Sequence, residues 1–170
     1  MEKINNENGY THIWVVVIIL VFLMMAALII DFGSLYMNNK TVKESLNRAV
    51  KAAALAIRED EQLAEGIFTI DPIRAEVNFK QILASNVGLN EITLEPLQTG
   101  SLVTEKPEIK EFIVQNVTPA IYYSSALENT FNFKHPSVLA VIRVKVKGVF
   151  SSRIITLYKL SSSQLTSIYD

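Results

Sequence analysis

The sequence contains no cysteine and only two histidines, His12 and His135. The absence of cysteine excludes a disulfide scaffold, a thiol nucleophile and a cysteine-ligated metal site, and it leaves the redox compartment undecided. No phosphate-binding loop, nucleophile elbow or zinc-protease motif is present, and the acidic residues lack the spacing of a calcium-binding loop. We therefore expect no catalytic residue, no metal site and no cofactor, and we predict that the protein is not an enzyme.

A large excess of charge is also lacking, since the net charge is −1. The charge is unevenly distributed, however: the segments 31–58, 59–128 and 129–170 carry +3, −8 and +5. A nucleic-acid-binding domain usually has a basic excess, so we expect no nucleic acid partner. The opposite charges favour contacts between these segments within the fold or, alternatively, between the subunits of an assembly.

One long stretch, residues 13–30, lacks charge, proline and glycine altogether (IWVVVIILVFLMMAALII). As a helix it would span about 27 Å, which is close to the hydrocarbon thickness of a bilayer. Thirteen of its residues are Leu, Ile, Val or Phe, which favours insertion by about 4 to 8 kcal/mol. We predict a transmembrane segment with Trp14 and Asp31 near its two boundaries. A cleaved secretory signal is less favoured, because the run exceeds the usual apolar region and no small-residue cleavage site follows Ile30.

The charges that flank this segment do not decide its orientation. Residues 1–12 contain one Lys and two Glu, whereas Lys40, Lys43 and Arg48 follow the segment. The positive-inside rule would then place the C-terminal side in the cytoplasm, but long domains are translocated despite such charges. We expect a single-pass membrane protein with an extracytoplasmic C-terminal domain.

The helical pattern continues beyond the apolar run. From residue 32 onward, apolar and small residues recur at alternating steps of three and four, which predicts one helix from residue 13 to about residue 57 that ends between 58 and 65. This seam packs either on the protein's own sheet or on a neighbouring subunit, and both can apply along different lengths. Its members are Phe32, Leu35, Asn39, Val42, Leu46, Ala49, Ala53 and Ala56.

The rest of the chain predicts one short helix and a sheet. Asp71 and Pro72 are typical of a helix start and Gly88 of a helix end, so we expect a helix over 72–87. The run 138–149 alternates with one face apolar throughout, and we expect this strand to pack on the long helix. Further strands are expected at 91–97, 109–117, 121–123 and 152–160, followed by a polar tail at 161–170 that is frayed or lightly docked.

Two segments carry a family resemblance: 30–36 (IDFGSLY) and 46–56 (LNRAVKAAALA). They resemble TadE/TadG-like proteins, pilin-like components of tight-adherence (Flp-type) pilus systems. Such proteins have an apolar helix, then Asp-x-Gly, an aromatic residue and an alanine-rich stretch that ends in Ala-Ala-Ala-Leu-Ala. The resemblance covers residues 10–57 and departs at Lys51, where the family often has Asp. It implies a pilin-like fold, a structural role in a pilus, and a location in a bacterial cell membrane or in a cell-surface pilus.

The first residues fit a prepilin leader in part. Cleavage after Gly9 would remove a short polar peptide and make Tyr10 the first mature residue. Type IV pilins generally have Glu at the fifth mature position, where this chain has Trp14, but TadG-like members need not be processed. Tyr10 and Trp14 also suit aromatic anchors at a membrane interface.

Together these features predict an α+β, pilin-like fold, in which a long N-terminal transmembrane helix packs on a small antiparallel sheet with one short extra helix. We expect a leader or cytoplasmic tail (1–12), a transmembrane segment (13–30), an exposed continuation of the helix (31–65) and a head domain (66–170). The expected function is that of a structural subunit or minor component of a Tad/type IV-like pilus. Its partners would be membrane lipid and other pilus or pilin-like subunits, including copies of itself. The alternative is a single-pass membrane protein whose extracytoplasmic domain binds a ligand or partner.

Overall fold

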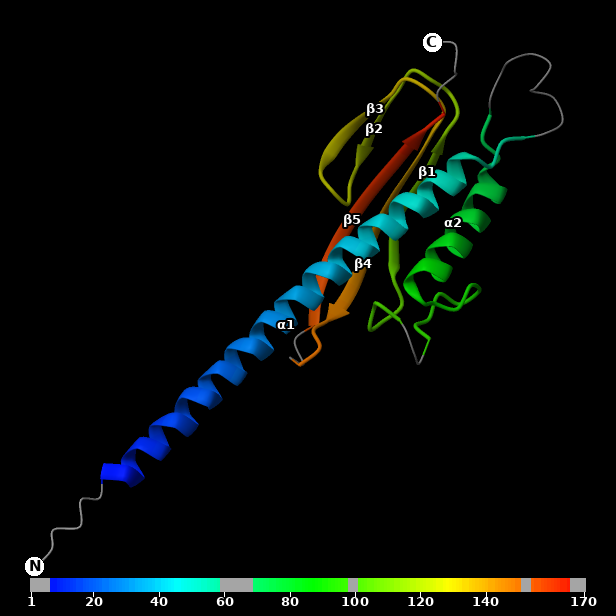
Figure 1. Cartoon of the computed structure of the whole chain (residues 1–170). Coiled ribbons are helices and arrows are strands. Elements are labelled where there is room, and N and C mark those ends of the chain that lie inside the picture. Colours follow the sequence, from blue (N-terminus) through cyan, green and yellow to red (C-terminus); the bar gives the residue numbers. More distant parts are fainter. Residues whose placement is uncertain (1–6, 59–68, 98–100, 151–153, 166–170) are drawn as a thin grey trace, which may run out of the picture.

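The computed structural model describes residues 7–58, 69–97, 101–150 and 154–165, and its longest element is α1, Glu7–Ala54. The predicted long helix is therefore confirmed, and it runs without a break through Gly33. Its end comes earlier than expected, because Ile57 already forms an isolated antiparallel bridge with Ile70. Residues 59–65 lie outside the described residues. Figure 1 shows that the first half of α1 projects away from the rest of the protein.

The second helix, α2 (Pro72–Val87), has the predicted bounds. The Asp71 side chain accepts hydrogen bonds from the backbone N–H groups of Ile73 (2.9 Å) and Arg74 (3.2 Å), so that it caps two otherwise unpaired donors. At the other end Gly88 adopts a left-handed conformation with φ 78°, which a residue without a side chain adopts readily. Local sequence signals thus fix both ends of this helix.

The strands form two sheets. β1 (Glu108–Gln115), β4 (Ser137–Lys147) and β5 (Ile154–Gln164) make an antiparallel sheet in the order β1-β4-β5. β2 (Ala120–Ser124) pairs with β3 (Asn129–Phe133) in a separate hairpin. The expected strands at 109–117, 121–123, 138–149 and 152–160 correspond to β1, β2, β4 and β5, whereas β3 was not predicted.

The prediction of a strand at 91–97 is wrong. The Asn90 side chain accepts hydrogen bonds from the backbone N–H groups of Ile92 and Thr93, and it folds the segment into a turn. Leu94 has a positive φ of 58° and is buried, while Ile92 is exposed. Only an isolated bridge between Leu89 and Pro96 remains. A local side-chain hydrogen bond therefore overrides the strand propensity of the segment.

Residues 161–164, predicted as part of a tail that is frayed or lightly docked, instead form the end of a strand. These residues belong to β5 and pair with Ser137–Ala140 of β4. β5 lies at an edge of the sheet, where one side of the strand needs no strand partner and polar residues suit the exposed side. The backbone of β4, and not the side chains of this segment, extends the strand. Residues 166–170 lie outside the described residues.

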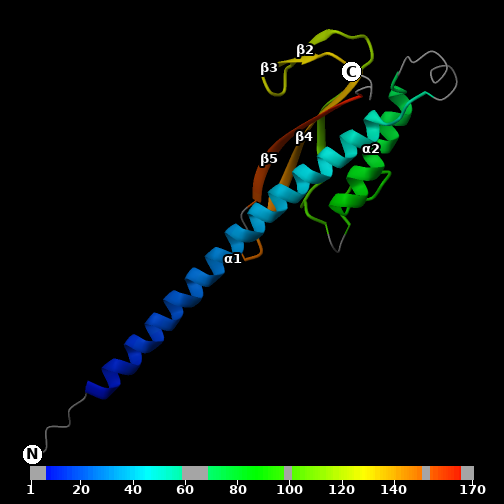
Figure 2. The same ribbon diagram turned by 45° about the horizontal axis from the view of Figure 1, so that its top comes forward.

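The elements stack in three layers. The sheet that contains β4 is the middle layer, the helices α1 and α2 cover one of its faces, and the β2–β3 hairpin lies on the other. Val138, Ala140, Ile142, Val144 and Val146 belong to the main core, which also contains buried residues of α1 and α2, and both helices pack on this side of the sheet (Figures 1 and 2). The predicted apolar face of this strand is therefore confirmed. On the opposite face, Leu139 and Val141 form a second cluster with Phe133 of β3. Burial on both faces explains why the first half of β4 is almost continuously apolar.

Acidic and basic segments meet within the fold. Glu108 on β1 lies 2.7 Å from Arg143 on β4, and Glu105 lies 2.8 Å from Lys145. These pairs confirm that segments of opposite charge contact each other inside one chain. Since the pairs are partly exposed, each stabilises the fold by only about 0–1 kcal/mol.

Candidate membrane and assembly surface

The most unusual surface of the protein is the first half of α1. Its large apolar residues from Ile13 to Met25 are all exposed, and its most apolar 18-residue window has no residue buried within the chain. Within the described part of the chain, this is the one helix long and apolar enough to cross a membrane, and a signal sequence has the same properties. An apolar surface of this size requires apolar surroundings. At its start, the rings of Tyr10 and Trp14 meet edge-to-face with centroids 6.4 Å apart.

Asp31, predicted to mark the water boundary of the apolar run, is only 8% exposed. Its carboxylate Oδ1 accepts a hydrogen bond of 2.9 Å from the backbone N–H of Phe150, a residue 119 positions away. Gly148 also lies against this carboxylate, because a Cβ added to it would come within 2.3 Å of Oδ1. We call this contact of Asp31 with Gly148 and Phe150 the Asp31 clasp. Gly148 and Phe150 were not predicted from the sequence as partners of Asp31.

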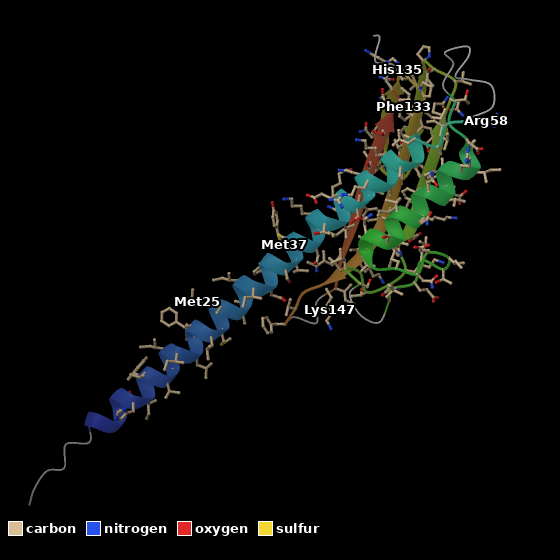
Figure 3. All side chains as sticks on the ribbon, turned by 45° about the vertical axis from the view of Figure 1, so that its right-hand side comes forward. Met25, Met37, Arg58, Phe133, His135 and Lys147 are labelled. Atoms are coloured by element: carbon tan, nitrogen blue, oxygen red, sulfur yellow. The ribbon has the colours of Figure 1, made fainter. Side chains whose placement is uncertain are left out.

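The Asp31 clasp holds the turn between β4 and β5 against α1 directly after the apolar run. In Figure 3 the Lys147 end of β4 lies at the foot of the head, where the projecting half of α1 begins. The side chains of Val149 and Phe150 are 62% and 63% exposed. The clasp therefore places two exposed apolar side chains at the level where the apolar run of α1 ends.

The predicted helix seam is divided between the interior and the surface. Its C-terminal five members are buried in this chain's own core, so they are not accessible to a neighbouring subunit in this structure. Leu35 packs partly against that core, and Asn39 is half-buried. Phe32, in contrast, is 69% exposed. The five core members are Val42, Leu46, Ala49, Ala53 and Ala56.

An apolar groove runs between α1 and the β4–β5 hairpin. Its volume is about 250 Å³. Within the described residues, Oδ1 of Asn39 is buried without a hydrogen-bond partner, and an unpaired buried polar atom costs about 1–3 kcal/mol. A donor from another molecule would remove that cost. The groove is lined by Phe32, Leu35, Tyr36, Asn39, Val146, Ile155 and Leu157.

A second hollow, of about 440 Å³, lies between α2 and the start of β1. Two of its charged side chains are paired: Lys80 lies 2.5 Å from Glu76, and Glu108 contacts Arg143 and Lys110. The hydrogen bond from Lys110 and the charge of Arg143 lower the pKa of Glu108, although partial desolvation opposes them. Its lining is Lys80, Ile92, Thr93, Leu94, Lys106, Pro107, Glu108 and Ile109.

Lys43 ties α1 to the sheet. Its Nζ donates a hydrogen bond to the backbone carbonyl of Leu160 on β5. Burial lowers the pKa of Lys43, and the nearby charge of Lys159 lowers it further. We assign this lysine a structural role, because its charge is directed at the chain's own backbone.

Glu111 ties β1 to the β2–β3 hairpin. Its carboxylate accepts hydrogen bonds from the Ser125 hydroxyl (3.1 Å) and the Ala126 N–H (2.9 Å). Burial raises the pKa of Glu111, but the neighbouring polar groups of the β2–β3 hairpin, among them the Ser125 hydroxyl and the Ala126 N–H, outweigh burial, so the pKa is lowered. Within the described residues, no group of three or more His, Asp or Glu side chains could hold a metal ion.

The predicted cleavage point after Gly9 falls within α1, and cleavage there stays a prediction.

The architecture itself, an apolar N-terminal helix packed on an antiparallel sheet, is pilin-like. Comparisons with known protein families, with curated proteins and with solved structures find no match for this chain.

Proposed function

We propose that this protein is a pilin-like structural subunit, or minor component, of a Tad/type IV-like pilus similar to TadE/TadG-like proteins, and that it is not an enzyme. The supporting observation is the division of α1 into two halves. Its C-terminal half is in the core of the head, whereas its first half exposes an apolar surface that none of the described residues covers. Such a helix can anchor the subunit in a membrane and then pack among other apolar helices.

Assembly through α1 would use the exposed part of the seam. Five seam residues are already in the head's own core. Phe32 and Tyr36 remain exposed along the apolar groove, next to the unpaired Oδ1 of Asn39. A neighbouring helix that fills this groove would bury apolar surface and could donate a hydrogen bond to Asn39. The assembly surface proposed here is therefore residues 13–30 together with this groove.

The test is a charged substitution in the groove with a matched control on the head. Tyr36→Arg and Ile92→Arg both replace exposed side chains, so both variants should fold and insert as the wild type does. Filaments sheared from the surface of the native host are then probed for the chain. We expect the wild type and Ile92→Arg in the filament fraction, and Tyr36→Arg only in the membrane fraction. Equal incorporation of Tyr36→Arg would exclude the groove as the assembly surface, and a wild type confined to membranes would exclude the filament role.

The hollow beside α2 supports a second candidate, a membrane-anchored domain that binds a small ligand. Its volume of about 440 Å³ is within the range of ligand sites, about 300–1,000 Å³. Lys106 contributes a cation to the lining. Native mass spectrometry of the chain purified from its own membranes would show added mass in the wild type and not in Lys106→Glu. If the wild type carries no added mass, this candidate is disfavoured.

A further inference from the structure

We propose that residues 148–150, which follow β4 at the start of the turn toward β5, are a second membrane contact that places Val149 and Phe150 in the headgroup and upper acyl region of the leaflet on the head's side. This inference rests on the proposed function, because it requires that α1 spans a bilayer. The head would then meet the membrane at two points, and its tilt relative to α1 would be restricted.

The Asp31 clasp sets the height of the turn. Asp31 directly follows Ile30, the last residue of the apolar run, and its carboxylate lies 2.9 Å from the backbone nitrogen of Phe150. The next charged residue along α1 is Lys40, which lies about 13 Å further along the helix axis. The polar zone of one leaflet is about 5–8 Å thick. The turn therefore lies near the boundary of hydrocarbon and headgroups, and Lys40 lies above it.

The exposed side chains of the turn have the chemistry of a membrane interface. Val149 and Phe150 are more than half exposed, and Ile154, which pairs with Lys147 across the hairpin, is 50% exposed. Aromatic and aliphatic side chains enter the interface, while a flanking lysine keeps its ammonium group among lipid phosphates. Asp31, the acid in the clasp, is only 8% exposed, so it adds little repulsion toward anionic lipid.

Continuity with the anchor favours lipid over a protein partner. Ile29, Ile30 and Phe32 on α1 are all exposed at the same height as the turn. Lipid that surrounds the last turn of the anchor therefore lies at the height of Val149 and Phe150. No separate partner is needed to cover Val149 and Phe150.

The absence of cysteine allows single-cysteine labelling of the full chain. Val149→Cys would carry an environment-sensitive fluorophore, with Phe150 left intact. The chain is reconstituted in vesicles of phosphatidylethanolamine and phosphatidylglycerol that contain either a shallow or a deep acyl nitroxide quencher, and iodide serves as the aqueous quencher. Ile92→Cys, on the head and 92% exposed, is the aqueous control. Leu20→Cys, in the apolar half of α1, reports on the anchor.

We expect the shallow nitroxide to quench the Val149 label severalfold more than the Ile92 label, and iodide to show the reverse order. A Val149 label that behaves like the Ile92 label, while the Leu20 label is quenched by the deep nitroxide, would overturn the membrane contact and leave the anchor intact. A Leu20 label accessible to iodide would overturn both the anchor and this inference. A Val149 label shielded from lipid and iodide alike would mean that protein covers the turn, and this result would also overturn the inference.

Discussion

Gly148→Ala should open the Asp31 clasp, although it adds only one methyl group. The new Cβ would lie 2.3 Å from Oδ1 and 2.7 Å from Cγ of Asp31, far inside van der Waals contact. The Asp31 side chain is too short to move its end away without leaving the Phe150 N–H. Whether the carboxylate rotates or the turn shifts, the hydrogen bond of 2.9 Å is lost.

The expected cost follows from that hydrogen bond. A bond to a charged acceptor contributes about 1.5–3 kcal/mol, and the loss leaves a buried carboxylate without this donor. We therefore expect Gly148→Ala to lower the free energy of unfolding by about 1.5–3 kcal/mol. Local opening should expose the Phe150 amide, whose hydrogen exchange would accelerate about 10- to 150-fold if the clasp alone protects it.

Urea unfolding of the full chain in detergent micelles measures the first quantity, and hydrogen exchange followed by mass spectrometry measures the second. Gly33→Ala is the matched control, because a Cβ at Gly33 meets nothing within 4 Å. Since Gly33 lies inside α1, this substitution should stabilise the helix by about 0.5–1 kcal/mol. The same chemical change is thus expected to have opposite signs at two glycines.

A double-mutant cycle with Asp31→Ala separates the clasp from other effects. Once the carboxylate is removed, Gly148→Ala has nothing left to displace and should be almost neutral, so the two substitutions should couple by about 1–3 kcal/mol. If Gly148→Ala costs as much in the Asp31→Ala background, the clash with the carboxylate is not the cause. Unchanged stability and unchanged exchange at Phe150 in Gly148→Ala alone would refute the clasp.

Three further predictions test the core, the hairpin contact and the leader. Leu46→Ala should cost about 2–5 kcal/mol, whereas Leu55→Ala, at an exposed position just after α1, should stay within about 0.5 kcal/mol in the same urea titration. Because the pKa of Glu111 is lower in the folded chain, its contribution is fully present above about pH 4.5 and is lost as pH falls through the lowered pKa. Acid titrations should therefore show less loss of stability in Glu111→Gln than in the wild type over that window, and equal losses would argue against the contact. If a prepilin peptidase processes the chain, N-terminal peptide mass spectrometry of protein from native membranes should find Tyr10 as the first residue, and an intact Met1 would exclude processing.

The elements that sequence reasoning located correctly are those with local signals. Asp71, Pro72 and Gly88 fixed α2 because caps act within one turn of the helix. The alternation along β4 identified the face that packs on the helices, since side chains of a strand alternate between its two faces. Local signals were also the source of the error at 91–97, where the Asn90 side chain competes with strand formation.

The functional surface was predicted only in part. The apolar half of α1 could be read from composition, whereas the burial of the seam from Val42 onward depends on where the sheet docks. The tail segment 161–164 became a strand because β4 supplied a pairing edge. No periodicity within that serine-rich segment predicts such a pairing, because the backbone of another strand provides it.

The sequence by itself determined that residues 13–30 form a helix without charge. These eighteen residues carry no charged side chain to face water, and a helix pairs the backbone N–H and C=O groups of such a segment with one another. Only the tertiary structure decided what happens where that helix leaves the apolar run. Asp31 was predicted to mark the boundary of the apolar run, and the fold buries its carboxylate against Gly148 and Phe150. A contact between residues 119 positions apart depends on the docking of β4 and β5 on α1, and it leaves no local trace in the chain.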